Sequence, residues 1–102
     1  MKVFTTFYKE KAQELERIHR EWVNSNKKMR SIELALRQIK TEGDIEITPA
    51  EKVLKKEYEN EKSKNDKICT DMYALKSFVR SMEIEANRHG VLWNKVEEIF
   101  GY

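Results

Sequence analysis

The segment FTTFYKEKAQELERIHREWVNSNKKMRSIELALRQI, residues 4–39, carries apolar side chains at alternating steps of four and three residues. The members of this row are Phe4, Tyr8, Leu15, Ile18, Trp22, Met29, Ile32, Leu36 and Ile39. Only Lys11 and Ser25 interrupt it. An average spacing of about 3.5 residues is the seam of a coiled coil, where one edge of a helix packs against a partner helix. The segment therefore predicts one long amphipathic helix.

A second row with the same spacing begins after the single proline, Pro49. It comprises Leu54, Tyr58, Glu61, Asn65, Ile68, Met72, Leu75, Val79, Met82, Ala86 and His89. The two rows have matched lengths, so the chain can fold back and pair them. We expect an all-α protein, an antiparallel two-helix coiled-coil hairpin with helices over about 4–41 and 49–89.

The connection between the rows, residues 42–48, has the composition of a turn. Gly43 can adopt the left-handed conformation that ends a helix, and Thr48 can cap the helix that follows. Ile45 and Ile47 alternate with polar residues, which leaves two interpretations open. They form either an apolar plug over the end of the hairpin or a short strand that pairs with another molecule.

A second helix stop lies at Arg88-His89-Gly90, where basic side chains complete the last turn and the glycine can end the helix. Residues 91–100 again have helical spacing, but so short a helix is stable only when it is docked. We expect it to pack at the base of the hairpin, against Phe4, Phe7, Phe78 and Met82. The chain from 1 to 102 is then a single helical domain.

The two halves of the predicted hairpin differ. Near the termini, in the half called the base, the facing side chains are apolar, whereas Ser25, Glu61 and Asn65 fall on the seam of the other half, the arm. Pairing the rows end to end sets Ser25 opposite Cys69. We therefore expect a well-packed base and a looser arm. The alternative is a break of the first helix at residues 24–26, since Ser and Asn favour helix ends.

Charge and cysteine content exclude several classes of protein. The 102 residues include 20 Lys and Arg against 18 Asp and Glu, so a net charge of +2 gives no global field to attract nucleic acid. One cysteine, Cys69, permits no internal disulfide and suits a reducing compartment. The N-terminus lacks the apolar core of a signal peptide, and no stretch approaches the ~20 apolar residues of a membrane span. We expect a soluble cytoplasmic protein without membrane contact.

Groups that could carry catalysis do not converge. The expected register separates Cys69 from both His19 and His89, so it forms no Cys–His pair. Glu85 and His89 share a helical face, but two ligands without a third are weak evidence for a metal. We predict no catalytic site, metal, cofactor or small-molecule substrate, and keep a small helical enzyme only as the third hypothesis.

One flank of the predicted hairpin carries side chains that the seam does not bury: Val23, Cys69 and Tyr73, beside His19. An uncovered apolar strip on a helical rod is typical of a partner surface. The leading hypothesis is a non-enzymatic protein–protein interaction module. It would be a small regulator or inhibitor, in the style of a phage or mobile element, that docks its arm on a larger protein or on a second copy as a homodimer.

The arm also carries a belt of basic residues, namely Lys27, Lys28, Arg30, Lys62, Lys64 and Lys67. Such a belt can bind phosphates. The aromatic residues lie elsewhere, so nucleic-acid bases would lack a stacking platform. Binding of nucleic acid or of an acidic partner is the second hypothesis.

Overall fold

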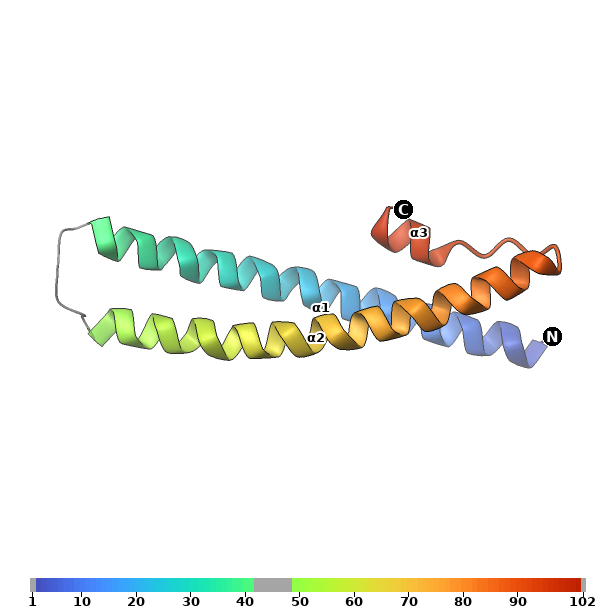
Figure 1. Ribbon diagram of the computed structural model, residues 1–102, viewed down its shortest axis with the longest axis horizontal. Coiled ribbons are helices and arrows are strands. Elements are labelled where there is room, and N and C mark those ends of the chain that lie inside the picture. Colours follow the sequence, from blue (N-terminus) through green and yellow to red (C-terminus); the bar gives the residue numbers. More distant parts are fainter. Residues whose placement is uncertain (1, 42–48, 102) are drawn as a thin grey trace.

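The computed structural model describes residues 2–41 and 49–101, which form two long helices and one short one (Figure 1). Helix α1 spans Lys2–Thr41, α2 spans Pro49–Arg88 and α3 spans Lys95–Phe100. The two long helices run antiparallel along each other, and α3 folds back beside them in the half that holds the N-terminus. The predicted all-α hairpin with a short C-terminal helix at its base is confirmed.

Several expectations concern residues outside this description. The helix end at Gly43, the cap at Thr48, and the plug or strand formed by Ile45 and Ile47 all lie there. The packing of the Phe4 side chain also lies outside the described part of the chain.

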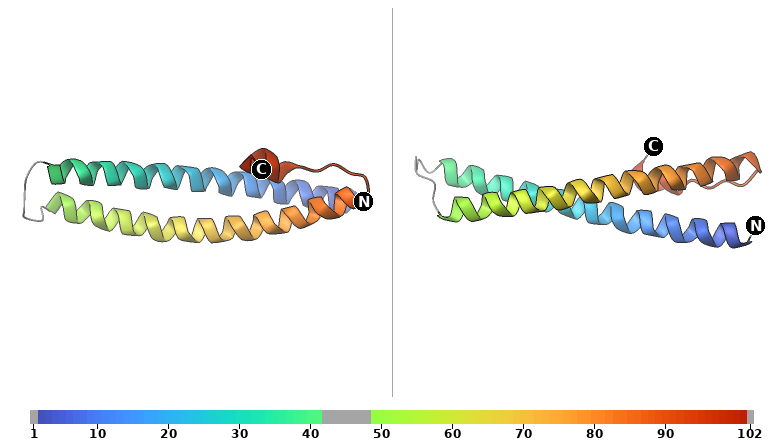
Figure 2. Two further views of the ribbon diagram at one scale, coloured as in Figure 1. Left: turned by 45° about the horizontal axis from the view of Figure 1, so that its top comes forward. Right: turned by 60° about the horizontal axis from the view of Figure 1, so that its bottom comes forward.

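The hairpin is a thin rod. It measures 64 × 20 × 14 Å, and its two long helices cross at a shallow angle as they wind around each other (Figure 2). A compact protein of 12.2 kDa exposes about 6,100 Å² of surface, whereas this one exposes 7766 Å². The rod therefore leaves long faces open to solvent.

The core lies in the base. Leu15 of α1, Met72 and Val79 of α2, and Val96 of α3 are completely buried there. Part-buried apolar residues pack around them, namely Ile18, Trp22, Leu75, Trp93, Ile99 and Phe100. Three of the four central residues belong to the two predicted rows, because the seam positions of a coiled coil face the partner helix. The fourth comes from α3, which closes the base as a third layer.

Helix α2 ends at Arg88, and the predicted stop at Gly90 follows two residues later. This glycine adopts φ = 80°, in the left-handed region that favours glycine. The Val91 N–H donates to the Ala86 carbonyl at 3.0 Å, and the Gly90 N–H donates to the Asn87 carbonyl at 3.1 Å. This pair of bonds is a Schellman motif, which satisfies carbonyl groups at the helix end and reverses the chain.

The site at which α3 docks differs from the prediction. We expected it on the flank of Phe7 and Phe78, but these two rings pack on each other at 5.9 Å and stay 40% and 46% exposed. Instead, Trp93 stacks on Tyr8, with the ring centroids 4.1 Å apart. Tyr8 follows Phe7 directly and so lies about 100° further around α1. The reason is polar: Tyr8 and Glu83 accept backbone N–H bonds from the start of α3, which the phenylalanines cannot do.

The register of the hairpin also differs from the prediction. Ser25 hydrogen-bonds to Glu61 and Asn65, not to the neighbourhood of Cys69, so the expected Ser25–Cys69 pairing is wrong. Polar side chains of α1 pair with polar side chains of α2. This pairing shifts the register of α2 along α1 by about one helical turn relative to the predicted register. The alternative break at residues 24–26 is also wrong, since α1 is continuous there. The Ser25 and Asn26 side chains bond across to α2 and so are not engaged in capping a helix end.

Candidate interaction surfaces

The four residues of the predicted partner surface lie near one another beside the C-terminal end of α3. His19 packs against Phe100 with ring centroids 5.0 Å apart, and Val23 follows one turn later on α1. On α2, Tyr73 is 49% exposed, and Cys69 is half-buried one turn away. We call the patch of His19, Val23, Cys69 and Tyr73 the Tyr73 surface.

Sequence reasoning missed two residues at this surface. The Lys76 ammonium lies 4.4 Å from the centroid of the Phe100 ring and 5.5 Å from that of Tyr73, so it connects the two rings by cation–π contacts. Phe100 also covers His19, which therefore is less open than expected. The spacing of Tyr73 and Lys76 on one helix was the available signal, but the arrival of Phe100 depends on how α3 docks.

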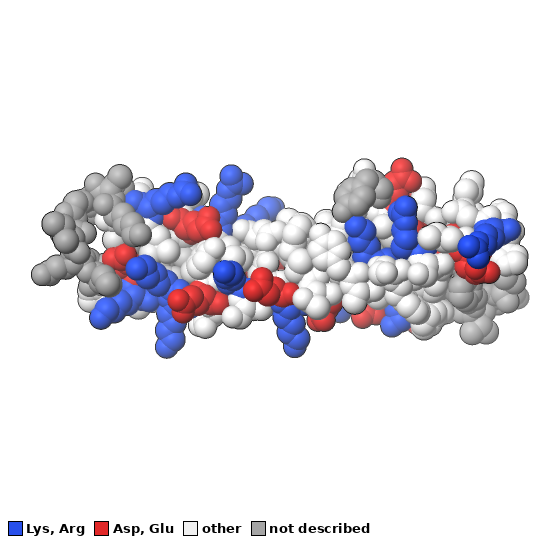
Figure 3. Space-filling model, viewed as in Figure 1, with Lys and Arg blue, Asp and Glu red and all other residues white. Residues whose placement is uncertain are grey.

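The basic belt extends around the arm, with all six of its residues exposed. Lys28 and Lys64 line one hollow of about 380 Å³, together with Glu21, Ser25 and Glu61. Lys27 and Lys67 are not among the residues that line this hollow. The space-filling view shows acidic residues interspersed with the basic ones over the arm (Figure 3). The belt is therefore a mixed-charge surface with one local basic pair.

A buried polar layer lies beneath that pair. Ser25 and Glu61 are only 4% and 6% exposed, and the serine hydroxyl donates to Glu61 Oε1 at 2.8 Å. Lys28 Nζ lies 3.4 Å from Glu61 Oε2. The hydrogen bond from Ser25 lowers the pKa of Glu61 most, and Lys28 lowers it further, against the opposing effect of burial.

Asn65 completes the layer. Its Nδ2 donates to Ser25 Oγ at 3.1 Å and to Asn26 Oδ1 at 2.7 Å. Each bond joins α1 to α2. A polar layer within an apolar seam favours one register, because any slip leaves its members buried without partners. This layer is a structural device that holds the arm in place.

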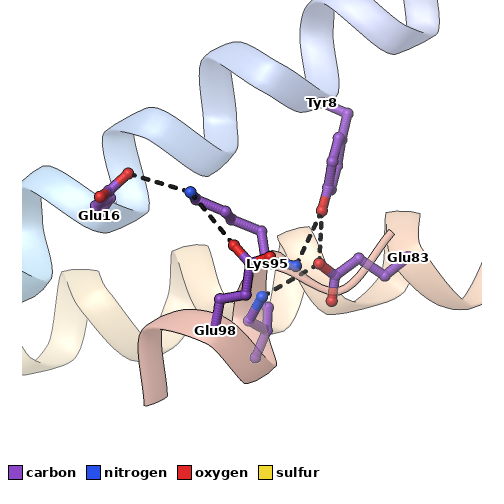
Figure 4. A network of polar contacts seen from close by, with 6 residues as sticks. Tyr8, Glu16, Glu83, Lys95 and Glu98 are labelled. Atoms are coloured by element: carbon purple, nitrogen blue, oxygen red, sulfur yellow. Dashed lines mark hydrogen bonds and ion pairs between the residues drawn. The ribbon is translucent and has the colours of Figure 1, made fainter. Parts of the chain in front are cut away.

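The base holds a second polar cluster, which fixes α3 (Figure 4). The Tyr8 hydroxyl donates to Glu83 Oε2 at 2.6 Å, and the Val96 N–H donates to the same oxygen at 3.2 Å. Burial raises the pKa of Tyr8, and the bond to Glu83 raises it further. Lys95 Nζ lies 3.5 Å from both Glu16 of α1 and Glu98 of α3. The cluster thus joins all three helices.

Within the described part of the chain, the remaining titratable side chains do not converge on a metal site. In residues 2–41 and 49–101, no group of three His, Cys, Asp or Glu side chains could hold a metal ion. His89 Nε2 lies 3.4 Å from Glu85 Oε1. This is a local contact between residues four apart in the sequence. Among the described segments, none of the helices combines the length and the apolar character needed to cross a membrane.

Comparison with known proteins adds no relative: the chain matches no protein-family model, no curated protein sequence and no solved structure.

Proposed function

We propose that this protein is a non-enzymatic interaction module, a small regulator or inhibitor that docks its helical rod on a larger protein through the Tyr73 surface. The observation that supports the proposal is the half-exposed Tyr73 ring, which lies one turn from half-buried Cys69 and is joined to Phe100 through Lys76. Half-exposed aromatic residues are common anchors in protein interfaces, because they bury a large area at a low cost in entropy.

The neighbours of Tyr73 support the same role. Lys76 and Phe100 lie beside Tyr73 and add a cationic and an apolar side chain to the surface. A partner of matching chemistry would offer an apolar groove for the tyrosine ring and a carboxylate near Lys76. Occlusion or bridging of the partner is the mechanism that a rigid rod allows. An origin in a phage or mobile element is part of this proposal.

The test compares two substitutions of exposed apolar residues. Tyr73→Arg places a charge on the proposed surface, and Leu34→Arg places one on the arm, where Leu34 is 56% exposed. Tagged wild-type and variant proteins are used for quantitative affinity capture from the native host. We expect a specific partner to be lost with Tyr73→Arg and retained with Leu34→Arg. Equal capture by all three proteins would show that the surface is assigned wrongly.

Nucleic-acid binding by the basic belt remains the second proposal. Lys28 and Lys64 lie on one hollow, and this is the observation in its favour. Such binding would weaken steeply as salt rises. A mobility-shift assay at low salt with Lys64→Glu as the comparison tests it, and the absence of any shifted complex with the wild-type protein would remove it.

A further inference from the structure

The flank opposite α3 has a regular order of side chains. On α1, Phe7, Glu14, Glu21 and Lys28 follow at steps of seven residues. Residues seven apart lie along one edge of a coiled coil, so these four form a row parallel to the rod axis. From the base of the hairpin toward the arm, the row contains an aromatic residue, two acidic residues and a basic residue.

Helix α2 repeats this order on the same flank. Phe78, Asp71 and Lys64 also follow at steps of seven. From the base of the hairpin toward the arm, they are an aromatic, an acidic and a basic residue. Two observations place the rows side by side. Phe7 contacts Phe78 edge to face, and Lys64 shares its hollow with Glu21 and Lys28 of α1. We call these seven residues the striped flank.

We propose that the striped flank binds a second copy of this chain, packed antiparallel about a twofold axis that crosses the middle of the rod. In that arrangement α2 lies against α2 of the other copy with its direction reversed. Asp71 then faces the other copy's Lys64, and Lys64 faces its Asp71. On α1, Glu21 and Lys28 form the equivalent pairs.

The charged pairs of α1 and those of α2 require the twofold axis at the same height along the rod. It must pass between Glu21 and Lys28 on α1 and between Lys64 and Asp71 on α2. Three of these four residues, together with Ile68, line the same hollow, so the two midpoints lie level across the hairpin. One axis can therefore pair the charges of both helices, as the self-complementary interface of a twofold dimer requires.

Charge order excludes the parallel arrangement. If two copies packed in the same direction through this flank, Glu14 and Glu21 would meet the other copy's Asp71, and the lysines would meet each other. Like charges in register across an interface oppose association. The antiparallel arrangement removes these clashes, because Glu21 and Asp71 then face lysines, and it sets Glu14 opposite the half-buried Ala35 of the other copy.

The available area is sufficient for a stable dimer. A face 64 Å long and 14 Å wide offers about 900 Å², and a typical specific interface takes about 800 Å² from each partner. The acids already form ion pairs within α1, Glu14 with Lys11 at 3.3 Å and Glu21 with Arg17 at 3.0 Å. These pairs are exposed and contribute little, so they leave the carboxylates able to pair across an interface.

The test uses charge reversals that complement one another. Asp71→Lys leaves two basic residues on the α2 row, and Lys64→Glu leaves two acidic residues. In each variant, like charges therefore face each other across the dimer interface. We expect the wild-type protein to have twice the mass of 12.2 kDa by light scattering, and each variant to raise the dissociation constant at least about tenfold. An equimolar mixture of the two variants should restore a complex of the dimer mass, because unlike charges then face each other.

Controls separate loss of the interface from loss of the fold. Asp66→Lys reverses an exposed charge on a different face of α2 and should leave the dimer intact. Far-UV circular dichroism checks that each variant is folded. Because Lys64 also favours the charged form of Glu61, Glu21→Lys provides an independent reversal on α1. A monomeric wild-type protein, unchanged dimers in every reversal, or a mixture that stays monomeric would each overturn the proposal.

Discussion

Helix α2 places the buried Glu83 in the base and the buried Glu61 in the arm, and these two carboxylates join different elements. Glu83 in the base accepts bonds from Tyr8 of α1 and from the Val96 N–H, so it joins three segments. Glu61 in the arm accepts from Ser25 and lies near Lys28, so it joins only the two long helices. The base is therefore fixed by a third layer, whereas the arm depends on a polar layer for its register.

Apolar packing follows the same division. The completely buried large side chains, Leu15, Met72, Val79 and Val96, all belong to the cluster in the base. In the described part of the arm, the buried residues are Ile32, Ser25, Glu51 and Glu61. A two-helix seam with polar members gains less from apolar burial than a three-helix core does. We therefore expect the base to be the more stable region.

The largest effect should come from a cavity in the base. Leu15→Ala should lower the free energy of unfolding by about 3 kcal/mol, because the residue is fully buried. Ile32→Ala in the arm should cost less, since the thin hairpin there can collapse around the gap. Urea denaturation followed by circular dichroism measures both. An equal or larger loss for Ile32→Ala would break the distinction between base and arm.

The next effect should come from the polar cluster of the base. Tyr8→Phe keeps the stacking of the ring on Trp93 but removes the hydroxyl that donates to buried Glu83. We expect a loss of about 2 kcal/mol, because a buried carboxylate loses a charge-assisted bond. Exchange of the Val96 amide hydrogen should also accelerate. Unchanged exchange at Val96 would show that the bond from Tyr8 does not support the bond between Glu83 and the Val96 N–H.

A smaller effect, with a pH signature, should come from the layer in the arm. The pKa of Glu61 is lowered in the folded state from its ordinary value of 4.5, so this group adds stability above that value and loses it as pH falls through the folded pKa. Ser25→Ala removes the bond that lowers it most and should cost about 1 kcal/mol at pH 7. The cost should shrink at a second, acidic pH below the folded pKa of Glu61, where its carboxylate is protonated.

The check on this prediction is a pair of denaturation series at the two pH values. Thr70→Ala provides a matched control, because its hydroxyl bonds to the Asp66 carbonyl within α2 and touches no carboxylate of the seam. Its cost should not depend on pH. A Ser25→Ala penalty that grows on acidification would contradict the account of Glu61.

The smallest effect on stability should come from the Tyr73 surface. Tyr73→Arg alters a half-exposed side chain outside the core, so the free energy of unfolding should change by no more than about 0.5 kcal/mol. Thermal melts of the variant and the wild-type protein measure this. A large destabilisation would mean that Tyr73 supports the fold, and its use as a binding residue would lose its basis.

Much of the fold was predictable because it rests on spacing. The two rows give both long helices, and Gly90 gives the second helix end, since only a residue tolerant of positive φ ends a helix in this way. The docking of α3 was not predictable from apolar spacing, because backbone bonds to Tyr8 and Glu83 select its flank. These bonds join residues far apart in the sequence.

The register and the candidate surfaces show the same limit. Which residue faces Ser25 depends on polar partners across the hairpin, and a pattern of apolar residues does not encode them. The members of the Tyr73 surface were predictable as a helical flank, whereas Phe100 and Lys76 join it only through the tertiary arrangement of α3. The partner stays a prediction, because a surface specifies the chemistry of an interface and no identity.

Residue-resolved hydrogen exchange under native conditions tests the central claim most directly. Amides open with free energies that report the local stability of each region. We predict that amides around Leu15, Met72 and Val79 exchange only at the rate of global unfolding, whereas those around Ile32 and Tyr58 exchange faster through local opening of the arm. Equal protection along the rod, or greater protection in the arm, would contradict the account.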